Sequence, residues 1–193
     1  MPDVLEVRWH GRGGQGAKTA AVLFADIAIS TGRFVQAFPQ YGPERMGAPV
    51  VAYNRVSSTP IRLHTPIERP DYVLILDPKF IGKRNLTAGL SPRGTVMVNT
   101  PRRPAEMRQA LNLPGATTVC CLDASRIAED TIGRNIPNVP MVAALVKILQ
   151  LVTLEDLKDF VREQLEKKFR GQPDLVKGNL EAVDRAYREV ERG

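Results

Sequence analysis

Apolar and polar positions alternate with two different periods along this chain of 193 residues. Short apolar runs bounded by Gly, Pro or Asp predict β-strands at residues 4–9, 34–38, 50–56, 61–64, 72–76, 95–98 and 117–122. Apolar residues spaced by three and four positions predict helices at residues 17–30, 104–111, 124–133, 141–151, 154–169 and 174–191. Strands that alternate with helices are typical of an α/β fold, and we predict a Rossmann-like, mostly parallel sheet.

Two regions depart from a regular alternation of strands and helices. Residues 50–56 and 61–64 are separated by only four residues, which predicts a β-hairpin inserted into the sheet. After residue 152 the pattern is entirely helical. We therefore expect a single domain over residues 1–193, with an α/β core at residues 1–152 and a helical C-terminal extension at residues 153–193.

Polar residues mark the points where several predicted helices begin. Asp77 before Pro78, and Asp123 further on, suit the N-cap position, and Pro78 suits the first helical position. Thr153 and Asp156 have capping-box spacing. The last helix carries a narrow apolar stripe that we expect to pack on its own domain: Val176, Leu180, Val183, Tyr187 and Val190.

Four glycines fall within six residues after the first predicted strand, at Gly11, Gly13, Gly14 and Gly16. A strand, a glycine turn and a helix, in this order, let backbone N–H groups at the helix N-terminus face an anion. The spacing also fits the dinucleotide-binding fingerprint, which requires an acidic residue about 20 residues later, at the end of the second strand. Residues 38–41 are Phe-Pro-Gln-Tyr, so a nicotinamide cofactor is not expected. A tight turn that only lets the helix pack on its strand stays open as an alternative.

A second loop, at residues 39–47, is long for a connection after a strand and carries Tyr41, Glu44 and Arg45. We predict that residues 41–47 lie beside the glycine turn, because both segments follow strands taken to be parallel neighbours. Arg12 and Arg45 would then face the same ligand or partner surface.

The two loops together carry a resemblance to a known family. Gly-Arg-Gly-Gly-Gln-Gly at residues 11–16, followed by Tyr-Gly-Pro-Glu-Arg-Met-Gly at residues 41–47, resembles the gamma subunits of the 2-oxoacid:ferredoxin oxidoreductases. The likeness is greatest to the gamma subunits of pyruvate:ferredoxin oxidoreductase, or pyruvate synthase. Ile-Pro-Asn-Val-Pro-Met at residues 136–141 and the segment at residues 151–157 agree, so the resemblance covers nearly the whole chain. Residues 46–48 depart from it, because Met-Gly-Ala stands where many members carry Arg-Gly-Gly.

The resemblance implies a non-catalytic subunit of an oxidoreductase that converts pyruvate and coenzyme A to acetyl-CoA, CO2 and reduced ferredoxin, or the reverse. It implies alpha, beta and delta subunits as partners, and ferredoxin through the complex. Thiamine diphosphate, magnesium and [4Fe-4S] clusters would be held by other subunits, and this chain alone would bind no cofactor. The chain would cover the active site and help to bind coenzyme A. The candidate contact residues are Gly11, Arg12, Gly13, Gly14, Gln15, Gly16, Tyr41, Glu44 and Arg45.

Two alternatives to a pyruvate enzyme remain at this point. Branched-chain 2-oxoacid:ferredoxin oxidoreductases have closely similar gamma subunits, so the 2-oxoacid is open. A self-sufficient nucleotide-binding protein on a Rossmann-like fold is the other alternative. The missing ribose-binding acid and the second loop both count against it.

The formal net charge of +6 favours an anionic ligand. The first 153 residues hold 18 basic and 11 acidic side chains, so the excess lies with the glycine turn. A positive field there would suit the phosphates of coenzyme A. Nucleic acid is not expected, because no basic run exceeds two residues, aromatic residues make up 6% of the chain, and no nucleic-acid motif is present.

The sequence shows no catalytic or metal-binding constellation. Cys120 and Cys121 are adjacent in an apolar strand, so we expect them to be buried on opposite faces. Two thiolates cannot supply the four ligands of an iron–sulfur cluster. His10 and His64 lie near strand ends without neighbouring Asp, His or Cys, and we expect ordinary core histidines.

The sequence also suggests where the protein works. Residues 1–3 lack the basic and apolar regions of a signal peptide, and no apolar run approaches the ~18 residues of a membrane span. We therefore expect a cytoplasmic protein without membrane contact. The isolated chain could form a homodimer through surfaces that its partners normally cover.

Overall fold

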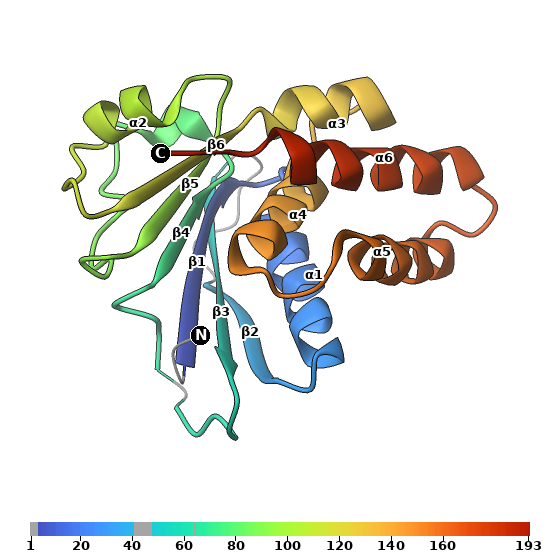
Figure 1. The fold of residues 1–193 in the computed structure, drawn as a ribbon, viewed down its shortest axis with the longest axis horizontal. Helices are drawn as coiled ribbons and strands as arrows, with labels where there is room; N and C mark the ends of the chain where they lie inside the picture. The colour runs from blue at the N-terminus through green and yellow to red at the C-terminus, as the bar shows by residue number, and fades with distance from the viewer. Residues whose placement is uncertain (1–3, 41–47, 64) are drawn as a thin grey trace.

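The computed structural model describes residues 4–40, 48–63 and 65–193. A seven-stranded sheet runs through the molecule in the order β2-β3-β1-β4-β5-β6-β7 (Figure 1). Its strands are β1 (Val4–Arg12), β2 (Phe34–Gln40), β3 (Pro49–Ser57), β4 (Tyr72–Ile75), β5 (Thr95–Asn99), β6 (Thr118–Leu122) and β7 (Glu191–Arg192). The helices are α1 (Ala17–Ser30), α2 (Pro104–Ala110), α3 (Ala124–Ile132), α4 (Asn138–Leu149), α5 (Leu154–Lys168) and α6 (Pro173–Glu189), with one 3-10 turn, η1 (Pro78–Phe80).

The four central strands form the parallel part of the sheet. β1 pairs with β4, β4 with β5 and β5 with β6, all in parallel, whereas β3 and β7 run antiparallel to their neighbours. The predicted α/β fold with a Rossmann-like sheet and C-terminal helices is confirmed. After β1 the chain crosses toward β2 on one side, and it later builds β4, β5 and β6 on the other side. The carboxyl ends of β1 and β4 therefore flank the crevice where open α/β sheets bind ligands.

The predicted hairpin of residues 50–56 and 61–64 is wrong in its second strand. β3 is hydrogen-bonded to β1 on one side and to β2 on the other, so no edge of β3 is left for a further strand. Residues 61–63 belong to no strand, and residue 64 lies outside the described residues. The Arg55 guanidinium donates to the carbonyl oxygens of Leu63 and Thr65, so this segment lies across the sheet face.

Helices cover the two faces of the sheet unequally. α1, α4, α5 and α6 lie on one side of it, and α2 lies on the other (Figure 1). The main core, on the α1 side, holds the large buried side chains Trp9, Phe24 and Met141, and a smaller core lies on the α2 side. The apolar stripe of α6 packs into the main core as predicted: Val176 and Val183 are buried, and Leu180, Tyr187 and Val190 are partly buried against it.

The two adjacent cysteines separate the two cores. Cys120 belongs to the main core and Cys121 to the smaller one, so the prediction of buried thiols on opposite faces is confirmed. Burial raises the pKa of Cys120 to about 11 and that of Cys121 to about 12. Both therefore remain neutral thiols near pH 7.

The N-cap residues were predicted from the sequence more accurately than the lengths of the helices. Asp123 accepts from the N–H of Arg126, and Thr153 accepts from the N–H of Asp156, as predicted. Asp77 caps only a single 3-10 turn, because that helix does not continue beyond Phe80.

Several helix boundaries differ from the prediction by one to three residues, and two of these differences have a clear structural reason. α4 begins at Asn138 instead of residue 141, because Pro140 falls in the first helical turn, where no backbone donor is needed. α6 ends at Glu189, and the next residues form the unpredicted strand β7 along β6. A strand of two charged residues leaves no apolar signal in a sequence. Among the described helices, none is long and apolar enough to cross a membrane.

Candidate functional site

β1 continues through Gly11 and Arg12, so the glycine turn consists of residues 13–16 and begins later than the sequence suggests. Gln15 closes the turn against the strand end. Its N–H donates to the Arg12 carbonyl oxygen (3.0 Å), and its side-chain Oε1 accepts from the Arg12 N–H (2.8 Å). Gln15 thus orders the backbone of the turn, and its neutral amide cannot act as a general acid or base near pH 7.

Gly14 and Gly16 have left-handed backbone conformations, with φ of 97° and 77°. At Gly16 a Cβ atom would also lie 2.7 Å from Nδ2 of Asn138, at the start of α4. Glycine at position 16 therefore allows α1 and α4 to approach closely. This supports the alternative explanation, that the glycines permit tight packing, although it leaves the ligand-binding explanation open.

The N-terminus of α1 follows the glycine turn directly and lacks a side-chain cap. Gly16 is the N-cap residue and provides no side-chain cap, and the first turn contains no acidic residue. The N–H groups of a first helical turn have no partners within the helix, and the helix dipole favours negative charge there. An anion could bind at this end of α1.

A cleft of about 640 Å³ opens between the glycine turn and the ends of the neighbouring strands. It lies at the carboxyl ends of β1 and β4, where the strand order reverses. Residues from five separate segments line it: Arg12–Gln15, Leu76–Lys79, Asn99, Ser125 and Asn135. Of these five segments, only the first was predicted from the sequence to be part of the site.

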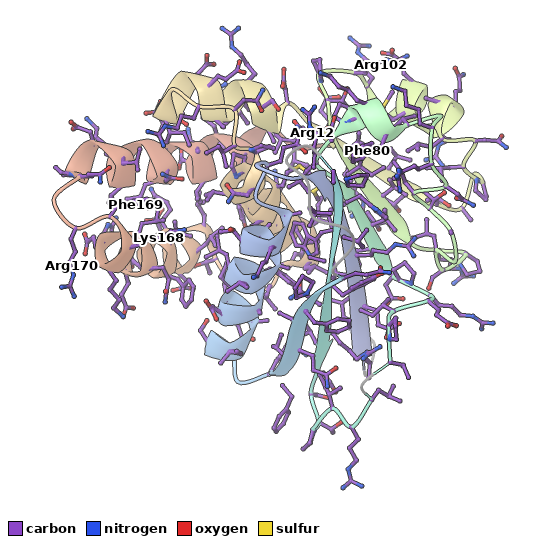
Figure 2. All side chains as sticks on the ribbon, turned by 180° about the vertical axis from the view of Figure 1, so that it is seen from behind. Arg12, Phe80, Arg102, Lys168, Phe169 and Arg170 are labelled. Carbon is purple, nitrogen blue, oxygen red and sulfur yellow. The ribbon has the colours of Figure 1, made fainter. Side chains whose placement is uncertain are left out.

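Arg12 is paired with a buried carboxylate inside this cleft. Its Nε lies 3.2 Å from Oδ2 of Asp77, and the exposed fractions of the two side chains are 40% and 3%. Oδ1 of Asp77 accepts from the N–H of Lys79 (3.1 Å), whereas Oδ2 has no hydrogen-bond donor within the described segments, so the Arg12 contact is an ion pair without hydrogen-bond geometry. Figure 2 shows Arg12 and Phe80 at the same end of the molecule. Arg12 is thus anchored at Nε, while its exposed part is available to a ligand.

Neutral polar side chains line the other wall of the cleft. Asn99 Nδ2 donates to the Leu76 carbonyl oxygen (2.8 Å) and to Oγ of Ser125 (2.9 Å). The Ser125 N–H donates to Oδ1 of Asn99, and its hydroxyl donates to Oδ1 of Asn135 (2.9 Å). Amides and a hydroxyl held in this way can orient a polar ligand, but they cannot act as general acids or bases near pH 7.

Sequence reasoning missed Asp77, Asn99 and Ser125 as site residues. A shared signal could have identified them, because each lies at or just after the end of a parallel strand: β4, β5 and β6 respectively. Asn135 gave no comparable signal, since it lies in the connection between α3 and α4.

His10 lies on the other face of β1 and is not the fully satisfied core histidine that the sequence predicts. Its Nε2 is buried and has no hydrogen-bond partner among residues 4–40, 48–63 and 65–193. Burial, and secondly the charge of Arg8, lower the pKa of His10 to about 4. The neighbouring Arg8 donates to the carbonyl oxygens of Leu86 and Ala88, and burial lowers its pKa. His64 lies outside the described residues.

The second predicted loop, with Tyr41, Glu44 and Arg45, lies outside the described residues, but its flanks are placed. The N–H of Gly13 donates to the carbonyl oxygen of Ala48 (2.9 Å), and Pro49 is paired with Arg12 across β1 and β3. The two segments therefore leave the sheet at the same end. The reason given for this was wrong, because β1 and β2 are not neighbours: β3 lies between them, antiparallel to both.

No group of three or more His, Cys, Asp or Glu residues that could hold a metal ion occurs in the part of the chain that the structure describes.

Comparisons with known proteins give a consistent result. The family model described as pyruvate ferredoxin/flavodoxin oxidoreductase matches residues 6–189. The chain is 40% identical over 185 residues to pyruvate synthase subunit PorC of Thermotoga maritima, and the match covers 96% of this chain and 94% of that protein. It is 39% identical over 188 residues to the pyruvate/ketoisovalerate oxidoreductases common subunit gamma of Pyrococcus furiosus, with 97% and 98% covered. The crystal structure of the pyruvate oxidoreductase subunit PORC of Thermotoga maritima matches with a TM-score of 0.84 at 37% identity, over 99% of both chains.

Proposed function

Because the chain belongs to the pyruvate ferredoxin/flavodoxin oxidoreductase family, we propose that it serves as the gamma subunit of a multisubunit 2-oxoacid:ferredoxin oxidoreductase that acts on pyruvate. The observation that carries this proposal is the match to two named subunits over more than nine-tenths of each protein. The complex would convert pyruvate, coenzyme A and oxidised ferredoxin to acetyl-CoA, CO2 and reduced ferredoxin, or catalyse the reverse reaction.

In this proposal the chemistry takes place on other subunits. The cleft offers amides, a hydroxyl, an arginine and a carboxylate that is already ion-paired, which suits binding better than proton transfer. We assign thiamine diphosphate, magnesium and the [4Fe-4S] clusters to the alpha, beta and delta subunits. This chain would cover the active site and help to hold coenzyme A.

The cleft suits the phosphates of coenzyme A. The backbone of the glycine turn would face a phosphate in the cleft, and Arg12 would add a charge-assisted contact. The close approach would depend on Gly13 and Gly14, because no Cβ atom stands between their backbone and a ligand. Tyr41, Glu44 and Arg45 would extend the site from the second loop.

The test replaces Arg12 in the assembled complex. Arg12→Ala should raise the KM for coenzyme A about 5- to 150-fold with assembly intact, because a direct contact to a phosphate contributes about 1–3 kcal/mol. Arg62→Ala, at an exposed position far along the chain, serves as the matched control and should leave the KM unchanged. Arg12→Ala could instead lower the fraction of assembled complex, while the complex that still assembles keeps a normal KM for coenzyme A. That outcome would show that the glycine turn only joins subunits.

A second substitution separates contact from orientation. Asp77→Asn keeps a cap for Lys79 but removes the charge that anchors Nε of Arg12. It should raise the KM for coenzyme A in the native background and have no further effect in an Arg12→Ala background. Equal effects in both backgrounds would show that Asp77 does not act through Arg12.

One relative favours a wider substrate range. The Pyrococcus furiosus protein is named as common to pyruvate and ketoisovalerate oxidoreductases, so a shared gamma subunit is the second candidate function. In that case this chain should co-purify with two different sets of partner subunits, one active on pyruvate and the other on ketoisovalerate. A stand-alone nucleotide-binding protein is less well supported, because β3 separates the end of β2 from the glycine turn.

A further inference from the structure

Positive charge is concentrated in one stretch of the chain, most of which lies outside the cleft. Residues 78–112 contain seven Lys or Arg residues and a single Glu, a formal charge of +6 that equals the net charge of the whole protein. This stretch includes η1, β5 and α2. η1 and α2 lie beyond the carboxyl ends of β4 and β5, and their apolar residues pack in the smaller core, on the side opposite α1.

Five cationic side chains of this stretch are exposed, in and just after η1 or just before α2. They define a basic surface: Lys79, Lys83, Arg84, Arg102 and Arg103. Arg102 pairs with Glu106 (2.9 Å) and still keeps a side-chain exposure of 55%. The other four make no ion pair with a carboxylate among the described residues, although Arg84 lies over the ring of Phe80. The remaining two cations do not contribute, because Arg93 precedes β5 at its other end and Arg108 binds backbone carbonyl oxygens.

A surface with so many like charges is unusual for a free protein, where the two signs are normally interspersed. A complementary acidic surface would relieve the repulsion and guide the approach of a partner. The basic surface also borders the cleft, since Lys79 belongs to both. Figure 2 shows Arg12, Phe80 and Arg102 at the same end of the molecule. A protein that covers the basic surface would therefore come to the edge of the cleft.

We propose that the basic surface binds an acidic face of the catalytic subunit of the same complex. The inference rests on the proposed function, in which this chain holds coenzyme A and presents it to the subunit that carries out the chemistry. Nucleic acid fits less well, because Phe80, the aromatic residue under Arg84, is partly buried against the smaller core and is not free to stack on bases.

The experiment reverses the charge of three residues that do not line the cleft. In the test variant Lys83, Arg84 and Arg102 are each replaced by Glu. In the matched control Arg69, Arg170 and Lys177 are each replaced by Glu, which changes the net charge equally at exposed positions elsewhere. Figure 2 shows Arg170 and Arg102 at well-separated places. Each variant is produced with the other subunits, and the assembled fraction is measured by size-exclusion chromatography at about 50 and about 500 mM salt.

The test variant should weaken assembly at low salt by tenfold or more and should lose most of the salt dependence that the native complex shows. The control should assemble like the native chain. A charge-conserving variant with Lys83→Arg, Arg84→Lys and Arg102→Lys should also assemble normally, which would exclude a simple effect of shape. The proposal is wrong if the two Glu variants behave alike, or if the test variant keeps the native salt dependence.

Two further measurements distinguish this inference from nucleic-acid binding and from the proposed role of Arg12 in binding coenzyme A. If the test variant assembles normally but the isolated native chain binds a short DNA duplex that the variant does not bind, the surface recognises nucleic acid and the proposal fails. If Arg12→Ala leaves the KM for coenzyme A unchanged while the test variant fails to assemble, the proposed ligand role fails and the docking surface stands.

Discussion

At the scale of single residues, the glycine turn contains two positions that share a backbone conformation but differ in their surroundings. Gly14 and Gly16 both have φ in the left-handed region. A Cβ atom at Gly14 would meet nothing within 4 Å, whereas one at Gly16 would lie 2.7 Å from Asn138. This difference separates backbone strain from steric overlap.

Substitution at the two glycines should therefore have unequal effects. Gly14→Ala should lower the free energy of unfolding by about 1 kcal/mol, the cost of a left-handed conformation alone. Gly16→Ala should lower it by about 2–4 kcal/mol, because α4 must also move away. Urea denaturation of the purified chain measures both values. Asn138→Gly should recover part of the Gly16→Ala loss, and equal losses at the two glycines would contradict the packing explanation.

His10 makes stability depend on pH. Its pKa in the folded chain, about 4, lies below the ordinary value of 6.5, so the unfolded chain binds its proton more readily. The resulting stability is fully present above pH 6.5 and is lost as the pH falls toward 4.

The size of this effect can be measured with one variant. Between pH 7 and pH 4, His10 should account for a loss of about 3 kcal/mol in the free energy of unfolding. Glutamine does not titrate, so the free energy of unfolding of the native chain should fall by that amount relative to His10→Gln between pH 7 and pH 4. A difference that is independent of pH would show that His10 keeps an ordinary pKa.

Residue type alone could indicate only part of the site. Arg12 and Gln15 stand out because they interrupt a glycine run, but the sequence indicates no partner for Arg12 within the chain. Its partner, Asp77, is 65 positions away and looks like a helix cap, which it also is. Only the parallel pairing of β1 with β4 brings the two together, and that pairing is not encoded locally.

At the scale of elements, apolar runs identified the strands well and their neighbours poorly. Residues 50–56 were correctly predicted as a strand, but the partner was not, because period-two alternation does not say which strand lies alongside. Helix starts with a capping side chain were found at Asp123 and Thr153. The start of α4 was misplaced, since a proline signals a break and a first turn equally well.

Asn54 joins three elements and provides a test of their connection. It is fully buried on β3, accepts from the indole N–H of Trp9 on β1 (2.7 Å) and donates to the Ala21 carbonyl oxygen on α1 (2.8 Å). Asn54→Ala should lower the free energy of unfolding by about 2–4 kcal/mol, because two buried polar groups lose their partners. Chemical denaturation measures this, with the exposed Asn85→Ala as the control. Asn54→Leu should be similarly damaging, and near-native stability for it would mean that side-chain volume matters more than the hydrogen bonds.

At the scale of the whole molecule, the sequence indicated the family and the fold but not the distribution of charge in space. The excess of basic residues in the first 153 positions was visible, yet it was assigned to the glycine turn. The structure places most of the exposed excess at η1 and before α2 instead, beside the cleft. Charges scattered along a sequence gather only where strand ends meet, so a basic surface without a basic run is found only after folding.

The position of β1 has a consequence for how the chain acquires its structure. This first strand lies inside the sheet, and its two neighbours come much later: Val4 pairs with Ser57, and His10 pairs with Ile75. Contacts of such long sequence separation slow folding, because loop closure precedes any gain from pairing. While the protein is being synthesised, β1 must therefore stay without a partner strand until β3 and β4 have been made. The apolar face of α1 stays exposed to solvent over the same interval. During that interval the exposed apolar surface and strand edges make the chain prone to aggregation, which is the state that chaperones protect.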